Sequence, residues 1–110
     1  GIAYTAEGIY FIAGDWDTER ISSSIVDPDN DEWHHIVGIR FSGTMYLYMD
    51  NIFLTSQGSH TYDIIGSSEL IIGADDSLIR YIEGNVDEVR IYNRALTEDE
   101  INILYNYPLI

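Results

Sequence analysis

The middle of the chain contains three strand-like runs that are separated by two-residue turns. They are WHHIVGIRF (33–41), TMYLYMD (44–50) and IFLTS (52–56). Ser42-Gly43 forms the first turn, and Asp50-Asn51, which includes the last residue of the second run, forms the second turn. Gly, Asn and Asp are the residues that best tolerate the positive φ of such tight turns. Strands that are joined by so few residues pair in antiparallel fashion. The sequence therefore predicts an antiparallel sheet in this region.

Further short β-rich runs lie on both sides of this region, and turn residues separate them. They cover residues 8–14, 20–26, 69–74 and 81–93. A chain of 110 residues with 45% apolar and 22% charged residues has room for one domain with one hydrophobic core. We therefore predict an all-β fold, an antiparallel β-sandwich.

Only the C-terminal end has the features of a helix. Thr97 and Glu100 have the spacing of a capping box, and the acids Glu98 and Asp99 suit the positive end of the helix dipole. Pro108 cannot continue a helix. We therefore expect one short C-terminal helix that starts after Thr97.

The charge of the chain excludes two classes of partner. The net charge is −14, and nucleic acids and anionic membrane surfaces repel such a chain. No apolar run approaches the roughly 20 residues of a membrane-spanning helix, so we expect no membrane insertion. The chain has no cysteine, which excludes disulfides and thiolate metal sites. Divalent cations and neutral sugars are compatible with the acidic balance.

Three ordered stretches resemble the second half of laminin-G-like domains, which belong to the concanavalin A-like lectin/glucanase superfamily. They are EWHHIVGIRFSGTMYLYMDNI, LIIGADD and GNVDEVRIYNRALTEDEI. The resemblance implies a jelly-roll sandwich that acts as a non-catalytic, extracellular or cell-surface recognition module. Its partner would be a glycan or an extracellular protein, and adhesion is a related role.

The resemblance also implies that part of the domain is missing. Domains of this family are longer and carry opening strands that are absent here, so residues 1–110 are expected to form a single, incomplete domain. A sandwich without these strands has an open sheet edge. The alternative function is therefore a structural or assembly module whose sandwich is completed by a neighbouring chain, including self-assembly through that edge.

Asp87 is the first candidate for a metal ligand. In an ideal strand it shares a face with Val89 and Ile91, so we expect it to point inward, where a carboxylate needs a partner. The resemblance implies structural calcium at this position, and calcium takes six to eight oxygen ligands. The alternative is that Asp87 accepts backbone N–H groups or pairs with Arg90. Asp75, which follows the strand 69–74, is a second candidate ligand or a solvated turn residue.

Three aromatic residues are candidates for carbohydrate binding. Tyr46 and Tyr48 share one face of their strand, opposite to Leu47, and Trp16 lies on an acidic turn. Aromatic rings stack on the C–H faces of sugars, and tyrosine hydroxyl groups form hydrogen bonds. Tyrosines also fill ordinary half-buried sheet faces, so both roles are open.

No other motif indicates catalysis. DWDTE (15–19) imitates the alternating carboxylates of family 16 glycoside hydrolases, but it occupies a turn. Retaining hydrolysis needs two carboxyl groups held about 5–5.5 Å apart, and a turn is a poor platform for them. DPDNDE (27–32) lacks the glycine and the glutamate of a calcium-binding loop. We therefore expect that the chain is not an enzyme.

The pair His34-His35 is expected to be structural. Neighbouring strand residues point to opposite faces, so the two rings cannot bind one metal ion from that strand. Trp33 shares the face of His35 and Val37 in this alternation and is expected in the core.

Overall fold

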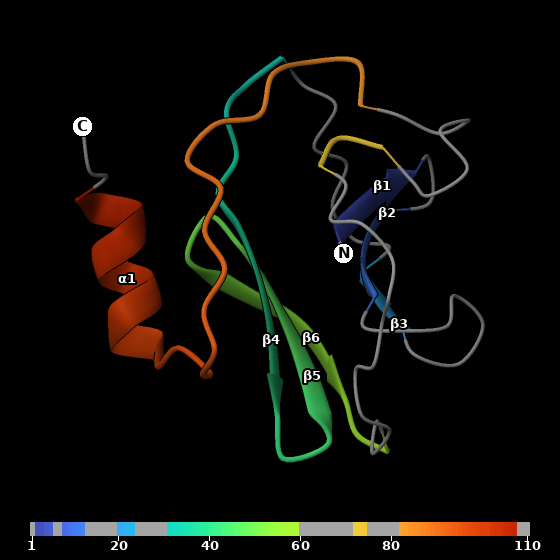
Figure 1. Ribbon diagram of the computed structural model, residues 1–110, viewed down its shortest axis with the longest axis vertical. Coiled ribbons are helices and arrows are strands. Elements are labelled where there is room, and N and C mark those ends of the chain that lie inside the picture. Colours follow the sequence, from blue (N-terminus) through green and yellow to red (C-terminus); the bar gives the residue numbers. More distant parts are fainter. Residues whose placement is uncertain are drawn as a thin grey trace.

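The computed structural model describes residues 2–5, 8–12, 20–23, 31–59, 72–74 and 82–107. The elements within them are β1 (Ile2–Thr5), β2 (Gly8–Ile12), β3 (Arg20–Ser23), β4 (Ile36–Phe41), β5 (Thr44–Met49), β6 (Ile52–Gln57) and α1 (Glu98–Asn106). The strands form two three-stranded sheets, in the orders β1-β2-β3 and β4-β5-β6, and all pairs are antiparallel. The predicted antiparallel β-sandwich with one short C-terminal helix is confirmed (Figure 1).

The two tight turns of the second sheet are formed as predicted. Ser42 and Gly43 have φ of 50° and 76°, and Asp50 and Asn51 have φ of 52° and 64°. Two consecutive residues with positive φ match the right-handed twist of the flanking strands. These turns therefore specify the register of β4-β5, and the register of β5-β6 next to the turn, from local sequence.

The strand β5 is buried on both faces. Met45 and Leu47 are fully buried and pack with Ile21 of β3, between the two sheets. On the opposite face, Tyr48 packs with Ile101 of α1. The second sheet is thus the middle of three layers, between the β1-β2-β3 sheet and α1 (Figure 1). Because side chains alternate along β5, Met45 and Leu47 belong to one apolar cluster and Tyr48 belongs to another.

The predicted strand over residues 81–93 is wrong for the part that the structure describes. Residues 82–97 form no strand; this C-terminal connector leads to α1 (Figure 1). Glu88 has φ of 55°, a left-handed conformation that interrupts an extended strand. Val89 and Ile91 are therefore 50% and 73% exposed instead of buried.

Other differences concern the ends of strands. β1 is an additional strand that the sequence pattern did not indicate, and β3 covers the described part, Arg20–Ser23, of the predicted run 20–26. The prediction that Trp33 is a core residue is wrong, because β4 begins only at Ile36 and the Trp33 side chain is 69% exposed. Of the predicted strand 69–74, the structure describes residues 72–74, with a single bridge residue at Ala74.

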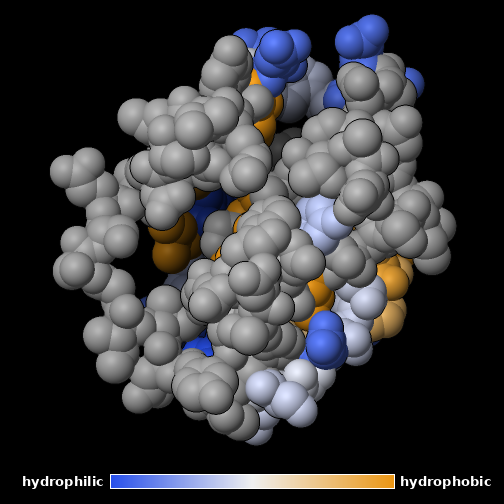
Figure 2. All heavy atoms as spheres, turned by 90° about the vertical axis from the view of Figure 1, so that its right-hand side faces the viewer, coloured by the Kyte–Doolittle hydropathy of each residue, from blue (hydrophilic) through white to orange (hydrophobic). Residues whose placement is uncertain are grey.

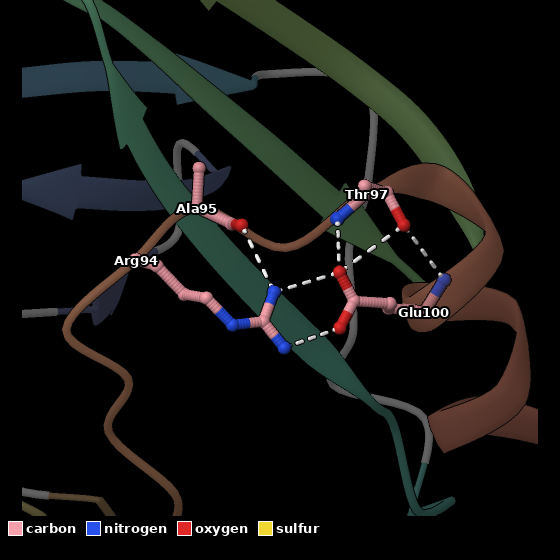
Figure 3. Close-up of polar contacts among 4 residues, drawn as sticks. All are labelled: Arg94, Ala95, Thr97 and Glu100. Carbon is pink, nitrogen blue, oxygen red and sulfur yellow. Dashed lines mark hydrogen bonds and ion pairs between the residues drawn. The ribbon is translucent and has the colours of Figure 1, made fainter.

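The predicted capping box of α1 is confirmed. The Thr97 hydroxyl accepts the backbone N–H of Glu100 at 3.2 Å, and the Glu100 carboxylate accepts the backbone N–H of Thr97 at 3.1 Å. Arg94 donates two hydrogen bonds to the same carboxylate, at 2.8 and 2.5 Å (Figure 3). This arginine and the Thr97 N–H lower the pKa of Glu100 to about 2.

This low pKa predicts an acid-sensitive helix start. The folded-state pKa of Glu100 lies below its ordinary value of 4.5, so its contribution to stability is complete above that value and is lost as the pH falls toward about 2. We expect the helical circular dichroism signal and the free energy of unfolding to fall over this range. The Glu100→Gln variant should be less stable at neutral pH and show a smaller fall. An identical pH profile for both proteins would contradict this role.

Apolar side chains also reach the surface. Figure 2 shows them in separate patches between hydrophilic residues on one side of the molecule. Phe41 and Ile52, in the second sheet, are 62% and 63% exposed. Scattered exposed apolar residues of this kind are normal. In the described part of the chain, no helix is long and apolar enough to cross a membrane.

Candidate functional site

The first turn of α1 and the β5-β6 hairpin border an open cavity of about 290 Å³. Its lining consists of Tyr48, Asn51, Phe53, Glu98, Asp99 and Asn102. A second, more apolar cavity of about 220 Å³ adjoins it, lined by Ile39, Phe41, Tyr46, Tyr48, Ala95, Leu96, Thr97 and Glu98. Tyr48 and Glu98 line both cavities, and we call the two cavities together the helix groove.

A β-bulge positions the aromatic residues of the groove. The register of β5-β6 shifts between Leu47 and Tyr48, which leaves Tyr48 opposite Phe53. Residues directly opposite each other in an antiparallel pair project to the same face of the sheet. The two rings meet edge to face, with centroids 5.5 Å apart. Phe53 is thus held by Tyr48 while 49% of its surface remains exposed.

A hydrogen bond across the groove connects the sheet to the helix. The Tyr48 hydroxyl donates to Glu98 Oε1 at 3.2 Å. Burial, reinforced by the nearby Glu98 carboxylate, raises the pKa of Tyr48, so its hydroxyl stays protonated at neutral pH. The side chain is 8% exposed. Tyr48 therefore acts as a fixed wall of the groove.

The rest of the larger cavity offers polar groups of several kinds. Asn51 and Asn102 carry amides that both donate and accept hydrogen bonds, and Glu98 and Asp99 carry acceptors. Small-ligand sites commonly combine aromatic side chains with polar groups that fix the orientation of the ligand. The arrangement can bind a polyhydroxylated ligand, with its C–H surface on Phe53 and its hydroxyl groups toward the amides and carboxylates.

The structure places only part of the predicted carbohydrate site. Tyr46 and Tyr48 both line the groove, but α1 and the end of the connector cover this face, so they do not form an open platform. Trp16 lies outside the described residues, as does the DWDTE stretch (15–19). The carbohydrate-binding role of all three aromatic residues stays a prediction.

The prediction that Asp87 points into the core is wrong. Asp87 is exposed, and its Oδ1 accepts the backbone N–H of the next residue, Glu88, at 2.8 Å. Arg90 pairs with Glu88 instead, at 2.6 Å. This local turn replaces the extended strand that would have turned Asp87 inward.

The described residues around Asp87 do not fit a calcium site. A calcium ion needs several converging oxygen ligands. No group of three or more His, Asp or Glu side chains in the described segments is arranged to hold a metal ion. Asp75, the second predicted ligand, lies outside these segments. Structural calcium stays a prediction.

The two histidines and Asp50 form a structural latch at the start of β4. His34 Nδ1 lies 2.6 Å from Asp50 Oδ2, and the His35 backbone N–H donates to Asp50 Oδ1 at 2.9 Å. The Asp50 N–H in turn donates to the His35 carbonyl at 2.8 Å. Burial lowers the pKa of His35, and Arg90 lowers it further, against the opposing effect of Asp50. This geometry supports the structural role that the sequence predicts for the pair.

Five residues of the larger cavity were not predicted as site residues from the sequence: Asn51, Phe53, Glu98, Asp99 and Asn102. Glu98 and Asp99 were interpreted only as helix-capping acids, and Asn51 only as a turn residue. Their convergence depends on where α1 packs against the sheet, which the Ile101 contact determines. The structure places the 50–51 turn and the start of the helix on the same side of the sheet, next to Tyr48. The sequence features that could have indicated this site are the turn residues and the capping box, which mark the ends of these two elements.

Comparisons with known proteins agree with the fold. A sequence profile described as the concanavalin A-like lectin/glucanases superfamily matches residues 3–102. No curated protein matches the chain. The crystal structure of an S-layer domain-containing protein (residues 221–444) from Clostridium thermocellum is similar, with a TM-score of 0.65 and 23% identity. The match covers 79% of this chain and 45% of that one, so this chain spans less than half of its length.

Proposed function

Because the chain belongs to the concanavalin A-like lectin/glucanase superfamily, we propose that it is a non-catalytic recognition module that binds carbohydrate in the helix groove. One observation carries this proposal. Phe53, half exposed and held by Tyr48, lies in a cavity whose other residues are amides and carboxylates. A sugar has C–H faces that can stack on such a ring and hydroxyl groups that can form hydrogen bonds with the amides and carboxylates.

The same reasoning favours binding without catalysis. Glycoside hydrolysis requires a pair of carboxyl groups on opposite sides of the scissile bond. Glu98 and Asp99 are consecutive residues at the start of one helix, and Glu98 already accepts the Tyr48 hydroxyl. Such a pair suits hydrogen bonding to a ligand better than acid–base chemistry.

We place this module outside the cell, secreted or at the cell surface. The superfamily assignment supports this, and the similar crystal structure is named for an S-layer domain. The net charge of −14 suits a neutral or cationic partner. The partner would therefore be a glycan of a surface or matrix, and adhesion would follow from that binding.

Glycan binding by the isolated chain tests the proposal. On a glycan array we expect binding that Phe53→Ala weakens about tenfold, since one stacked aromatic ring contributes on the order of 1 kcal/mol or more. Ile52→Ala is the matched control, because Ile52 is a neighbouring exposed apolar residue that does not line the groove. Absence of any glycan ligand, or equal losses in both variants, would contradict the proposal.

A second candidate function, a structural or assembly module, is favoured by the C-terminal connector. Ile82, Val86, Val89 and Ile91 are each about half exposed or more. Among the described residues, no backbone N–H group between residues 83 and 93 donates to a backbone carbonyl, and only that of Glu88 donates to a side chain, that of Asp87. An apolar segment with unpaired backbone groups is a template for an added strand.

Sedimentation and hydrogen exchange distinguish this second function. If the connector takes up a strand from another chain, the complex should protect the amides of residues 85–92, and Val89→Asp should abolish association. A monomer at all concentrations, with unprotected connector amides, would exclude it. Glycan binding in the groove is independent of this outcome.

A further inference from the structure

The charges in the helix groove restrict the class of sugar that it can accept. Among the described residues, the lining of the larger cavity contains two carboxylates, from Glu98 and Asp99, and no arginine. Glu98 accepts a hydrogen bond from the Tyr48 hydroxyl, whereas the exposed side chain of Asp99 forms no hydrogen bond or ion pair with the other described residues. An anionic ligand would face both carboxylates without a compensating cation. The cavity therefore disfavours uronic, sialylated and sulfated sugars.

The start of the helix does not offset this charge. A helix N-terminus carries a partial positive charge of about half a unit, which two carboxylates exceed. The third acid of the first turn, Glu100, is neutralised by Arg94 and by the backbone of Thr97. The local field is thus negative, in the same sense as the whole chain with its charge of −14. The negative field of the groove and the negative net charge of the chain both attract a cationic group.

The aromatic wall has the same preference. Phe53 borders the cavity beside these carboxylates, and the electron-rich face of an aromatic ring attracts an ammonium group within about 6 Å. Asn51 and Asn102 add amides that can bind hydroxyl groups on the same ligand. The cavity thus combines contacts for an ammonium group with contacts for hydroxyl groups.

We propose that the groove recognises sugars that carry a free amine, such as the glucosamine units of a de-N-acetylated glycan. This inference rests on the proposed carbohydrate binding and specifies its substrate class. In the bound state, the protonated amine would lie between Phe53 and Asp99, while the ring hydroxyl groups bond to the amides. N-acetylation removes the charge and would weaken binding.

Calorimetry with the whole chain tests this proposal with three probes at about pH 6, where the amine is protonated. They are the β-1,4-linked trisaccharide of glucosamine, the same trisaccharide fully N-acetylated, and lysine methyl amide. We expect the amino trisaccharide to bind at least about tenfold more tightly than either of the others at low salt, with the preference reduced at high salt.

The variants separate local from overall charge. Asp99→Asn and Glu98→Gln should each weaken binding of the amino trisaccharide about 3- to 5-fold, the effect of one exposed charge pair. Asp87→Asn makes the same change in net charge on an exposed residue outside the groove and should leave binding unchanged. Equal losses in Asp87→Asn and Asp99→Asn would overturn the proposal, since the attraction would then be non-specific.

The remaining outcomes are distinguishable. If the N-acetylated trisaccharide binds as tightly as the amino form, the groove recognises neutral sugars; the preference for amines is then wrong while the proposed function stands. If lysine methyl amide binds as tightly as the amino trisaccharide, the site recognises an ammonium group alone, and the sugar assignment is wrong. If no sugar binds here or on the glycan array, both proposals are wrong.

Discussion

The free energy of unfolding of the Gly38→Val variant is expected to be about 1–3 kcal/mol lower than that of the native chain. A Cβ atom at Gly38 would lie 2.6 Å from Cδ1 of Phe11 and 2.8 Å from Cε1 and Cγ, which is inside van der Waals contact. Phe11 belongs to the first sheet and packs against the cluster between the sheets. The added side chain must therefore displace the Phe11 ring from its place between the two sheets. Chemical denaturation measures the loss.

Two comparisons isolate the cause. Gly84→Ala should be nearly neutral, because a Cβ there meets only Ile82 Cγ2, at 3.6 Å. In a Phe11→Leu background the cost of Gly38→Val should shrink, since the two positions are in contact and their effects are not additive. If Gly38→Val costs the same in both backgrounds, the sheets do not pack with this ring over β4.

The Asp50→Ala variant is expected to lose about 2–3 kcal/mol of stability. The Asp50 carboxylate accepts hydrogen bonds from His34 Nδ1 and from the His35 backbone N–H. Its removal therefore leaves two part-buried donors without this partner. Hydrogen bonds to charged groups contribute about 1.5–3 kcal/mol. Asp50 also has φ of 52°, which alanine adopts less readily than aspartate or asparagine. Thermal and denaturant unfolding both report the loss.

Asparagine separates these contributions. Asp50→Asn keeps an acceptor oxygen and tolerates the left-handed turn, so we expect it to lose less than Asp50→Ala. Glu83→Ala, which removes an exposed carboxylate, should change stability by no more than about 0.5 kcal/mol. If Asp50→Ala were as mild as Glu83→Ala, the latch between β4 and the β5-β6 turn would not contribute to the fold.

The local features of the fold could be predicted from the sequence because neighbouring residues determine them. Positive φ at Asn51 follows from the turn residues, and the separation of Leu47 from Tyr46 and Tyr48 on opposite faces follows from the alternation of β5. The Thr97–Glu100 capping box is likewise complete within four residues. The resemblance to the superfamily added the arrangement of these elements in two layers.

Features that depend on distant contacts were predicted less well. The alternation around Asp87 looks like a buried strand, but a strand forms only where another strand pairs with it, and Glu88 instead adopts a turn conformation. The groove combines the 50–51 turn and a β-bulge with the start of α1. In sequence, Tyr48 at the bulge and Glu98 at the start of α1 are 50 residues apart. Their meeting depends on how Ile101 packs on the sheet, and no local pattern encodes that contact.

The proposed function requires that a ligand binds between α1 and the β5-β6 hairpin, and an NMR titration tests this most directly. With the tightest ligand from the glycan array, we predict that the largest shifts of backbone and side-chain amides occur at Asn51, Phe53, Asp99 and Asn102. The amides of the connector at residues 86–92 should remain unchanged. Shifts that cluster on the connector, with the helix groove unaffected, would contradict the assignment of the site.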